Sequence, residues 1–214
     1  MFALYRYALI RSLIIALFLL NVAASISAQP KAPKPALELT AAIVSQRYCA
    51  VTVDSSSLQL TLKVQYRNVA SERLILYKGH DLFFQTRIRS APGNPAGPYE
   101  VWVLNSRYFD EELEPIDEVS PGRVFTILPP GGVYQREIVI GVGLVGGKAE
   151  RGDSAISAGD HTLQLSVSTW YKSRSLAQKL RQQWQRKGLL WFDPLASTPI
   201  RFTARRPDAI VPCR

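Results

Sequence analysis

The residues that chemistry would need are few and widely spaced in this chain of 214 residues. The histidines, His80 and His161, and the cysteines, Cys49 and Cys213, lie far apart along the sequence. Some local motifs indicate a catalytic nucleophile or a zinc site, namely G-x-S-x-G, H-E-x-x-H, or a cysteine next to a histidine. This sequence contains none of them. We therefore predict no catalytic residue, no metal ion and no cofactor, and we expect that the protein is not an enzyme.

One glycine-rich run has the spacing of a dinucleotide-binding loop. Gly141–Gly146 fits G-x-G-x-x-G and follows an apolar stretch. Such a loop binds pyrophosphate only where a helix begins at the glycines and points its first amides at the ligand. Residues 147–152 are polar, interrupted by glycine and without an apolar stripe. We interpret the run as the bent end of a strand followed by a loop.

Six carboxylates gather within the nine residues Asp110–Glu118. Clustered carboxylates bind calcium, which takes about six to eight oxygen ligands, but the spacing and central glycine of an EF-hand are absent. A glycosidase needs two carboxylates fixed across a cleft. We expect a solvated acidic loop, with metal binding or catalysis as the alternative.

The segment His161–Phe192 contains six basic residues and no acidic residue, and tryptophans alternate with the basic positions. Basic side chains beside amphipathic aromatic rings suit an anionic surface. The candidate residues for binding an anionic partner are Arg174, Arg181, Arg186 and Lys187. In the alternative, these charges only face solvent, and the carboxylates of Asp110–Glu118 balance them.

The N-terminal residues have the pattern of an export signal. Two arginines precede the apolar run Ser12–Leu20, and the small residues of Ser25–Ala28 follow it. The apolar run is short for a membrane span, so we predict a signal peptide over residues 1–28, with an uncleaved anchor as the alternative. Residues 29–36 form a proline-rich spacer. We expect a secreted protein, periplasmic or extracellular.

The charge of the chain is strongly basic, with 26 lysines and arginines against 17 acidic residues and a formal net charge of +9. A basic balance favours anionic partners, while simple solubility is the alternative explanation. We expect the partner to be a protein or an anionic component of the cell envelope, including peripheral contact with a membrane, and we expect no nucleic acid.

The stretch Leu58–Arg67 is the element around which the rest must be organised. Its leucines, valine and tyrosine fall on one parity, and its polar residues fall on the other. This alternation is typical of a strand with one face on a core and one in water. Because the buried face needs a second layer, the stretch predicts a β-sandwich.

Further strands are expected wherever short apolar or alternating runs recur between turns. They are Leu37–Ala41, Leu74–Tyr77, Asp81–Ile88, Tyr99–Leu104, Val124–Leu128, Val133–Ile140, Thr162–Trp170 and Pro199–Thr203. Ser90–Pro98 and Gly146–Gly159 are expected to be loops. The spacing predicts one all-β domain over 37–214, an antiparallel Greek-key sandwich of the immunoglobulin-like class with about seven or eight strands.

One segment has a helical period instead. Ser175–Gln178 fits a capping box, and Leu176, Leu180 and Trp184 recur at four-residue spacing up to Gly188. We predict a helix over 176–187, inserted near the C-terminus, whose apolar stripe caps an open edge or end of the sandwich. The candidate basic side chains are expected to lean toward water.

The order of features resembles exported bacterial immunoglobulin-like domains. An alternating strand ends at Asn68, Leu128–Gly132 forms a proline-glycine turn before a strand, and Ala158–Leu163 opens a late strand. In such domains an aromatic residue at this last place often fixes the corner of the sandwich. His161 occupies that place in this sequence.

The order Asn68, Leu74–Tyr77, Tyr99–Trp102 and Leu128–Gly131 is also similar to that of small all-β proteinase inhibitors of bacilli. Both resemblances extend from Leu58 to Val167 and leave out the helix. Our leading hypothesis is a non-catalytic exported binding or interaction domain of the cell envelope. The inhibitor resemblance implies an alternative in which a loop such as 90–98 acts as a wedge, and an enzyme that modifies envelope polymers is the second alternative.

The cysteine pair yields a first prediction. An exported chain with two cysteines, each near one end of its domain, is expected to join Cys49 and Cys213 in a disulfide. Mass spectrometry with and without reductant should detect the bond in protein produced in the periplasm, whereas two free thiols would contradict it. Closing so long a loop stabilises by about 4–5 kcal/mol in chain-entropy terms, so Cys213→Ser should lower the unfolding midpoint.

Overall fold

The computed structural model describes residues 36–50, 56–78, 83–94, 96–104, 116–145, 155–170, 172–205 and 211–212. All of them belong to the unit Pro35–Arg214. The predicted signal peptide, the spacer up to residue 35, Cys213 and most of the acidic loop lie outside these ranges. Within the described ranges, no helix is long and apolar enough to span a membrane.

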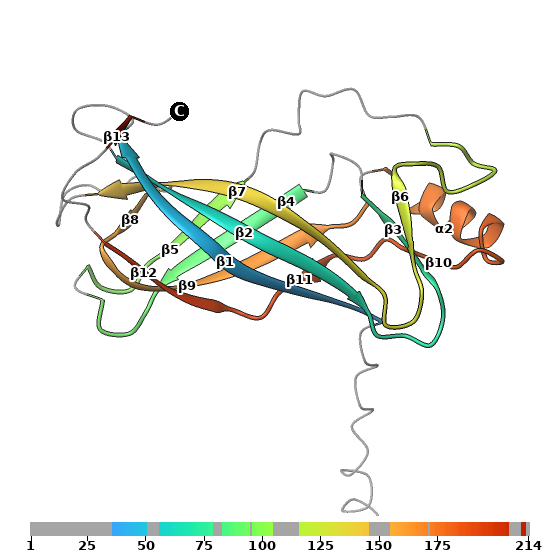
Figure 1. Cartoon of the computed structure of the whole chain (residues 1–214), viewed down its shortest axis with the longest axis horizontal. Helices are drawn as coiled ribbons and strands as arrows, with labels where there is room; N and C mark the ends of the chain where they lie inside the picture. Colours follow the sequence, from blue (N-terminus) through green and yellow to red (C-terminus); the bar gives the residue numbers. More distant parts are fainter. Residues whose placement is uncertain are drawn as a thin grey trace, which may run out of the picture. The chain divides into compact units, whose positions relative to one another are not determined.

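Two largely antiparallel sheets form a sandwich (Figure 1). The first sheet contains, in order, β13 (Val211–Pro212), β1 (Leu37–Ala50), β2 (Ser56–Asn68), β7 (Val133–Val145) and β8 (Ala155–Ser157). In the second sheet, β11 (Leu195–Ala196) and β12 (Ile200–Ala204) pair with one side of β9 (Gly159–Ser168), which is followed by β4 (Phe83–Ser90) and β5 (Glu100–Leu104).

The connections between these sheets have Greek-key order. The chain crosses from β2 in the first sheet to β4 in the second, returns from β5 to β7, and crosses again from β8 to β9. The order β12-β9-β4-β5 matches the three-stranded sheet of an immunoglobulin domain with one strand added at its edge. The predicted class, an all-β sandwich with a single helix, is therefore confirmed.

Strand β2 occupies the centre of the first sheet because its alternation is nearly perfect. The side chains of one parity, Leu58, Leu60, Leu62, Val64 and Tyr66, are fully buried. Both backbone edges of the strand are used, since β1 pairs with one side and β7 with the other. Burying each such side chain contributes about 1.5–3 kcal/mol before entropy is subtracted, so this strand carries a large share of the core.

A third, small sheet lies beside the helix (Figure 1). It contains β10 (Leu189–Trp191), β3 (Leu74–Tyr77) and β6 (Phe125–Leu128), with β10 parallel to β3. The helix, α2 (Arg174–Gln183), packs against it through its C-cap residue Trp184, whose ring and that of Phe125 are arranged edge to face with centroids 5.0 Å apart. Trp170, just after β9, also contacts Phe125 and Tyr77, so an aromatic cluster joins the helix, the small sheet and the sandwich.

The structure has more strands than the seven or eight predicted. The additional ones are β8, β10, β11 and β13, each two or three residues long. Strands this short show no periodicity, and their pairing partners are distant in sequence. β8 lies within Gly146–Gly159, so the expectation of an unbroken loop there is wrong.

The helix begins and ends earlier than predicted. Ser173, rather than Ser175, is the N-cap, and its hydroxyl accepts a hydrogen bond from Leu176 N at 3.3 Å. The regular helix ends at Gln183, and residues 184–187 form a turn that leads to Gly188. A β-carbon at Gly188 would lie 2.8 Å from the carbonyl oxygen of Arg73, so only glycine allows the close pairing of β10 with β3.

The buried Asn68 ties two turns together at the end of β2. Its side-chain Nδ2 lies 2.8–3.0 Å from the carbonyl oxygens of Glu72, Leu128 and Pro129, and its Oδ1 accepts from Ala70 N. Its backbone also pairs with the proline-glycine turn before β7. One amide side chain thus satisfies the carbonyls of the β2–β3 and β6–β7 connections at once.

Replacing this amide tests whether it fixes the end of the sandwich. Asn68→Ala removes the donor to the buried carbonyl of Leu128 and to the part-buried carbonyls of Glu72 and Pro129, so we expect a loss of about 2–4 kcal/mol in the free energy of unfolding, measured by urea denaturation. Ser71→Ala, in the exposed part of the same turn, is the control and should change stability little. Equal effects of the two substitutions would show that Asn68 has no such role.

Candidate functional site

The basic candidate residues lie on α2 and in the turn that follows it. This part of the chain packs beside the small sheet, at one end of the domain. Ala177, Leu180 and Trp184 are buried, whereas Leu176 is only half-buried. Trp184 Nε1 also donates to the carbonyl oxygen of Glu118 at 2.9 Å. The predicted apolar stripe is therefore confirmed for Leu180 and Trp184, and it fixes which side of the helix faces water.

Three of the four candidate residues are exposed. Arg186 and Lys187 lie in the turn after α2, and their side chains make no hydrogen bond or ion pair with any residue that the structure describes. Arg174 lies at the first turn, 3.6 Å from the Asp193 carboxylate, with 70% of its side chain exposed. These three cations are therefore accessible to a partner.

Arg181 is different, and it corrects the expectation that its side chain leans toward water. Its Nε and Nη2 both donate to the carbonyl oxygen of Leu190, at 3.0 and 2.8 Å. Its guanidinium also lies over the Phe192 ring, 4.0 Å from the centroid. Arg181 thus fastens α2 to β10, a contact that helical periodicity cannot reveal because Leu190 lies outside the helix.

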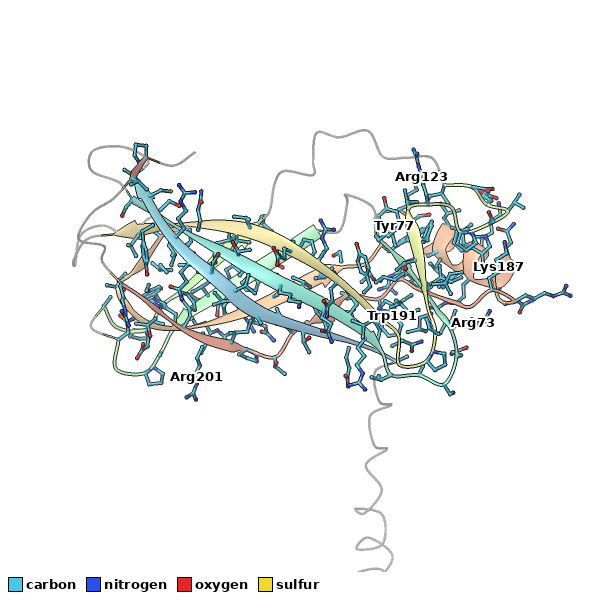
Figure 2. The ribbon with its side chains drawn as sticks, viewed as in Figure 1. Arg73, Tyr77, Arg123, Lys187, Trp191 and Arg201 are labelled. Atoms are coloured by element: carbon cyan, nitrogen blue, oxygen red, sulfur yellow. The ribbon has the colours of Figure 1, made fainter. Side chains whose placement is uncertain are left out.

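The exposed cations extend beyond the predicted helix. We define the basic end surface as the exposed residues Arg73, Arg123, Arg174, Arg186 and Lys187. Figure 2 shows Arg73, Arg123 and Lys187 at the end of the domain that carries α2. Arg73 precedes β3, and its backbone oxygen accepts from Leu189 N at 2.8 Å, which brings it close to the turn holding Lys187. Sequence reasoning missed Arg73 and Arg123 because they lie far from the helix along the chain.

The acidic residues near this surface neutralise only part of it. Lys179 Nζ pairs with Glu118 at 2.6 Å, as the alternative explanation of the basic segment expects. The pKa of the Asp117 carboxyl is lowered by hydrogen bonds from the Val119 amide and the Ser120 hydroxyl, and Lys187 adds a smaller effect. Residues 110–115 lie outside the described part of the chain.

The other chemical candidates do not form a site. Gly141 and Gly143 lie within β7, opposite Gln59 and Ser57 of β2, so the glycine run is a paired strand there and not a phosphate loop. No group of three or more metal-ligating side chains occurs in the described ranges. Cys49 is fully buried and is not a free thiol. Cys213 lies outside the described residues, so the predicted pairing stays a prediction.

A second polar cluster is buried at the opposite end of β2, near β8. His161 is 1% exposed, and its Nε2 lies 2.5 Å from Tyr99 Oη. Ser157 N donates to Tyr99 Oη at 2.9 Å, and Ser157 Oγ donates to Asn94 Oδ1 at 3.3 Å. The resemblance to immunoglobulin-like domains indicated only that His161 stands where an aromatic residue often fixes the corner, while Tyr99, Ser157 and Asn94 gave no sequence signal.

Comparison with known proteins adds no family to this description. No family model matches the chain, and no curated protein matches it. Among solved structures, it is similar to the X-ray structure of Northeast Structural Genomics Consortium target SoR45, with 10% identity and a TM-score of 0.34 over 78% of this chain and 85% of that chain. A likeness this weak carries no argument, so the function must be inferred from the site itself.

The role of Arg181 can be tested by stability. Arg181→Ala removes two charge-assisted hydrogen bonds and the contact with Phe192, so we expect a loss of about 1–3 kcal/mol in the free energy of unfolding. Arg181→Lys should show most of the same loss in the free energy of unfolding, because an ammonium group lacks the planar, forked donors of a guanidinium. Gln182→Ala, at an exposed position of the same helix, is the matched control. If urea unfolding of Arg181→Ala and Gln182→Ala is the same, Arg181 does not fasten the helix.

Proposed function

We propose that the protein is a non-catalytic, exported binding domain of the cell envelope and that its basic end surface contacts an anionic partner. The observation that carries this proposal is the pair Arg186 and Lys187. Both are exposed and belong to a turn closed by a hydrogen bond from Lys187 N to the carbonyl oxygen of the buried Trp184, and neither side chain has a hydrogen-bond or ion-pair partner in the described ranges. Such cations are available to phosphate, sulfate or carboxylate groups.

Stability does not explain why these cations gather at one end. Exposed ion pairs contribute about 0–1 kcal/mol, and both the Arg174–Asp193 and Lys179–Glu118 pairs are well exposed. Unpaired cations near one another repel instead. Clustered charge that does little for folding is better explained by recognition of an opposite charge.

Export is part of the same proposal. It rests on the signal-peptide pattern of residues 1–28 and on the cysteine pair. Two contacts support the pairing of Cys49 with Cys213. Cys49 lies opposite Val211 and Ala50 lies opposite Pro212, so the chain reaches the end of β1 directly before Cys213.

The proteinase-inhibitor alternative is less well supported. An inhibitory wedge should protrude and present an extended segment, whereas the loop after β4 folds back on the sandwich. Ala91 N donates to Asp160 O, and Asn94 is buried and hydrogen-bonded through its side chain to the backbone of Asp160 and Ala96. Inhibition of a protease panel at micromolar protein would restore this alternative.

Charge reversal tests the proposed surface. Arg186→Glu combined with Lys187→Glu should abolish binding to anionic vesicles or to envelope polysaccharide in sedimentation assays, and should leave the unfolding midpoint nearly unchanged. Binding by the unaltered protein should weaken with salt, because the screening length falls from about 30 Å at 0.01 M to about 8 Å at physiological ionic strength.

The matched control reverses the same number of charges elsewhere. Arg47 lies on β1 and Arg201 on β12, and both are exposed. Figure 2 shows Arg201 away from α2. Arg47→Glu with Arg201→Glu should therefore keep binding. Absence of binding by the unaltered protein to both materials at low salt would refute the proposal. If both double variants lose binding equally, the binding depends on the net charge of the protein and not on the basic end surface.

A further inference from the structure

The hydrogen bonds around His161 fix where its proton lies. Nδ1 is 2.9 Å from the carbonyl oxygen of Gly159, and because a carbonyl only accepts, Nδ1 carries the hydrogen. In the neutral ring Nε2 is then an acceptor. Tyr99 Oη, 2.5 Å away, must therefore donate its hydrogen to His161. In the neutral state, the hydrogen bonds of His161 are therefore satisfied by only one tautomer.

The rest of the cluster agrees with this assignment. Tyr99 Oη accepts from Ser157 N, and Asn94 Oδ1 accepts from both Ser157 Oγ and Ala96 N. Asn94 Nδ2 donates to the carbonyl oxygen of Asp160 at 3.2 Å. Neutral donors and acceptors therefore alternate through the cluster, and the hydroxyl and imidazole gain their partners from each other.

These side-chain bonds join four segments, three of which are also linked by backbone bonds such as Ala91 N to Asp160 O and Ser90 N to Tyr99 O. Asn94 belongs to the β4–β5 loop, Tyr99 precedes β5, Ser157 ends β8, and His161 lies at the start of β9. The His161 ring also stacks on Phe202 of β12, with centroids 5.3 Å apart and the planes inclined by 26°. β8 is only three residues long and pairs with β7 alone, so the bonds of Ser157 add to the burial of Ile156 in keeping it in place.

A positive charge on His161 would have little to balance it. The charged group of these segments nearest in sequence is Asp160, whose Oδ1 already accepts from Thr203 Oγ1 at 2.6 Å. Arg89 of β4 and Arg201 of β12 lie on the alternate, exposed parity of their strands. Tyr99, Ser157 and Asn94 are neutral. The Tyr99 hydroxyl can rotate to accept from a protonated ring and donate to Ser157 Oγ, 3.1 Å away, but this rotation brings neither a counter-charge nor water to the buried cation.

We propose that His161 and Tyr99 form an acid-released latch, which closes this corner of the sandwich while His161 is neutral and frees the β4–β5 loop and β8 when His161 takes up a proton. This regulation is independent of the anionic-partner proposal, because it concerns the other end of β2. It predicts local opening of one corner and not unfolding of the domain.

The pH dependence has a definite sign. Burial lowers the pKa of His161, and this outweighs the opposing effects of the Gly159 carbonyl and of Asp160. Since the folded corner binds this proton less readily than the open one, the stabilisation is fully present above the ordinary histidine pKa of about 6.5. It is lost progressively as the pH falls below that value toward the lowered pKa of the closed form.

Hydrogen exchange of the full chain at pH 7.5 and pH 5.5, corrected for intrinsic exchange rates, tests the latch. We expect the amides of residues 90–98 and 155–161 to exchange faster at pH 5.5, while those of β2 keep their protection. His161→Gln can still donate to Gly159 O and accept from Tyr99, but it does not titrate. In this variant the acid-dependent acceleration should disappear.

The control is His80→Gln, which removes the only other histidine and should leave the acid response intact. Should His161→Gln fail to fold, the imidazole resonances of the unaltered protein provide a second measurement. We expect His161 to titrate below the ordinary histidine range and the Tyr99 ring resonances to follow with the same midpoint. Corner amides that exchange alike at both pH values, or an acid response that survives in His161→Gln, would overturn the proposal.

Discussion

The alternating apolar face of β2 is the constraint on which the structure depends. The five inward side chains from Leu58 to Tyr66 are fully buried, and β1 and β7 occupy both backbone edges of the strand. The inward face therefore needs a complete second sheet, which β9 and β4 supply with their own alternating residues. The two sheets cover each other's inner faces but leave the two ends of the sandwich uncovered. The small sheet with α2 lies at one end of β2, and the His161 cluster lies at the other.

The end of β2 at Asn68 is closed by secondary structure. Asn68 connects the turns that lead into β3 and β7, and the small sheet with α2 completes that end. Because Trp184 and Arg181 hold α2 through contacts inside the domain, the outward cations on and after the helix are not needed for its attachment. One side of the helix is thus anchored to the domain and the other faces solvent, and the solvent side can carry a cluster of positive charge without weakening the attachment.

The sequence allowed the long elements to be predicted, because their period is imposed by burial. β2, β7, β9 and the stripe of α2 follow directly from the spacing of apolar residues. β10 could not be found in this way, since its three residues become a strand only through pairing with β3, more than a hundred residues earlier. Likewise, the capping-box motif favours Ser175, and only the folded position of Leu176 N shows that Ser173 is the cap. For the candidate site, the basic composition of the segment was enough to propose Arg186 and Lys187 as binding residues. The structural role of Arg181 could not be predicted, because it depends on where the carbonyl of Leu190 lies in the folded chain.

The two polar features of the molecule lie at opposite ends of the same strand. Ser56 at the start of β2 pairs with Leu144, which in turn pairs with Ile156 of β8, next to Ser157 and the His161 cluster. Asn68 at its other end adjoins the connections to the small sheet. With a rise of about 3.3 Å per residue, the strand separates these ends by about 40 Å, several screening lengths at physiological ionic strength. Charge at the basic end therefore cannot set the protonation of His161 directly. The proposed acid response and the proposed anion binding can therefore be tested separately.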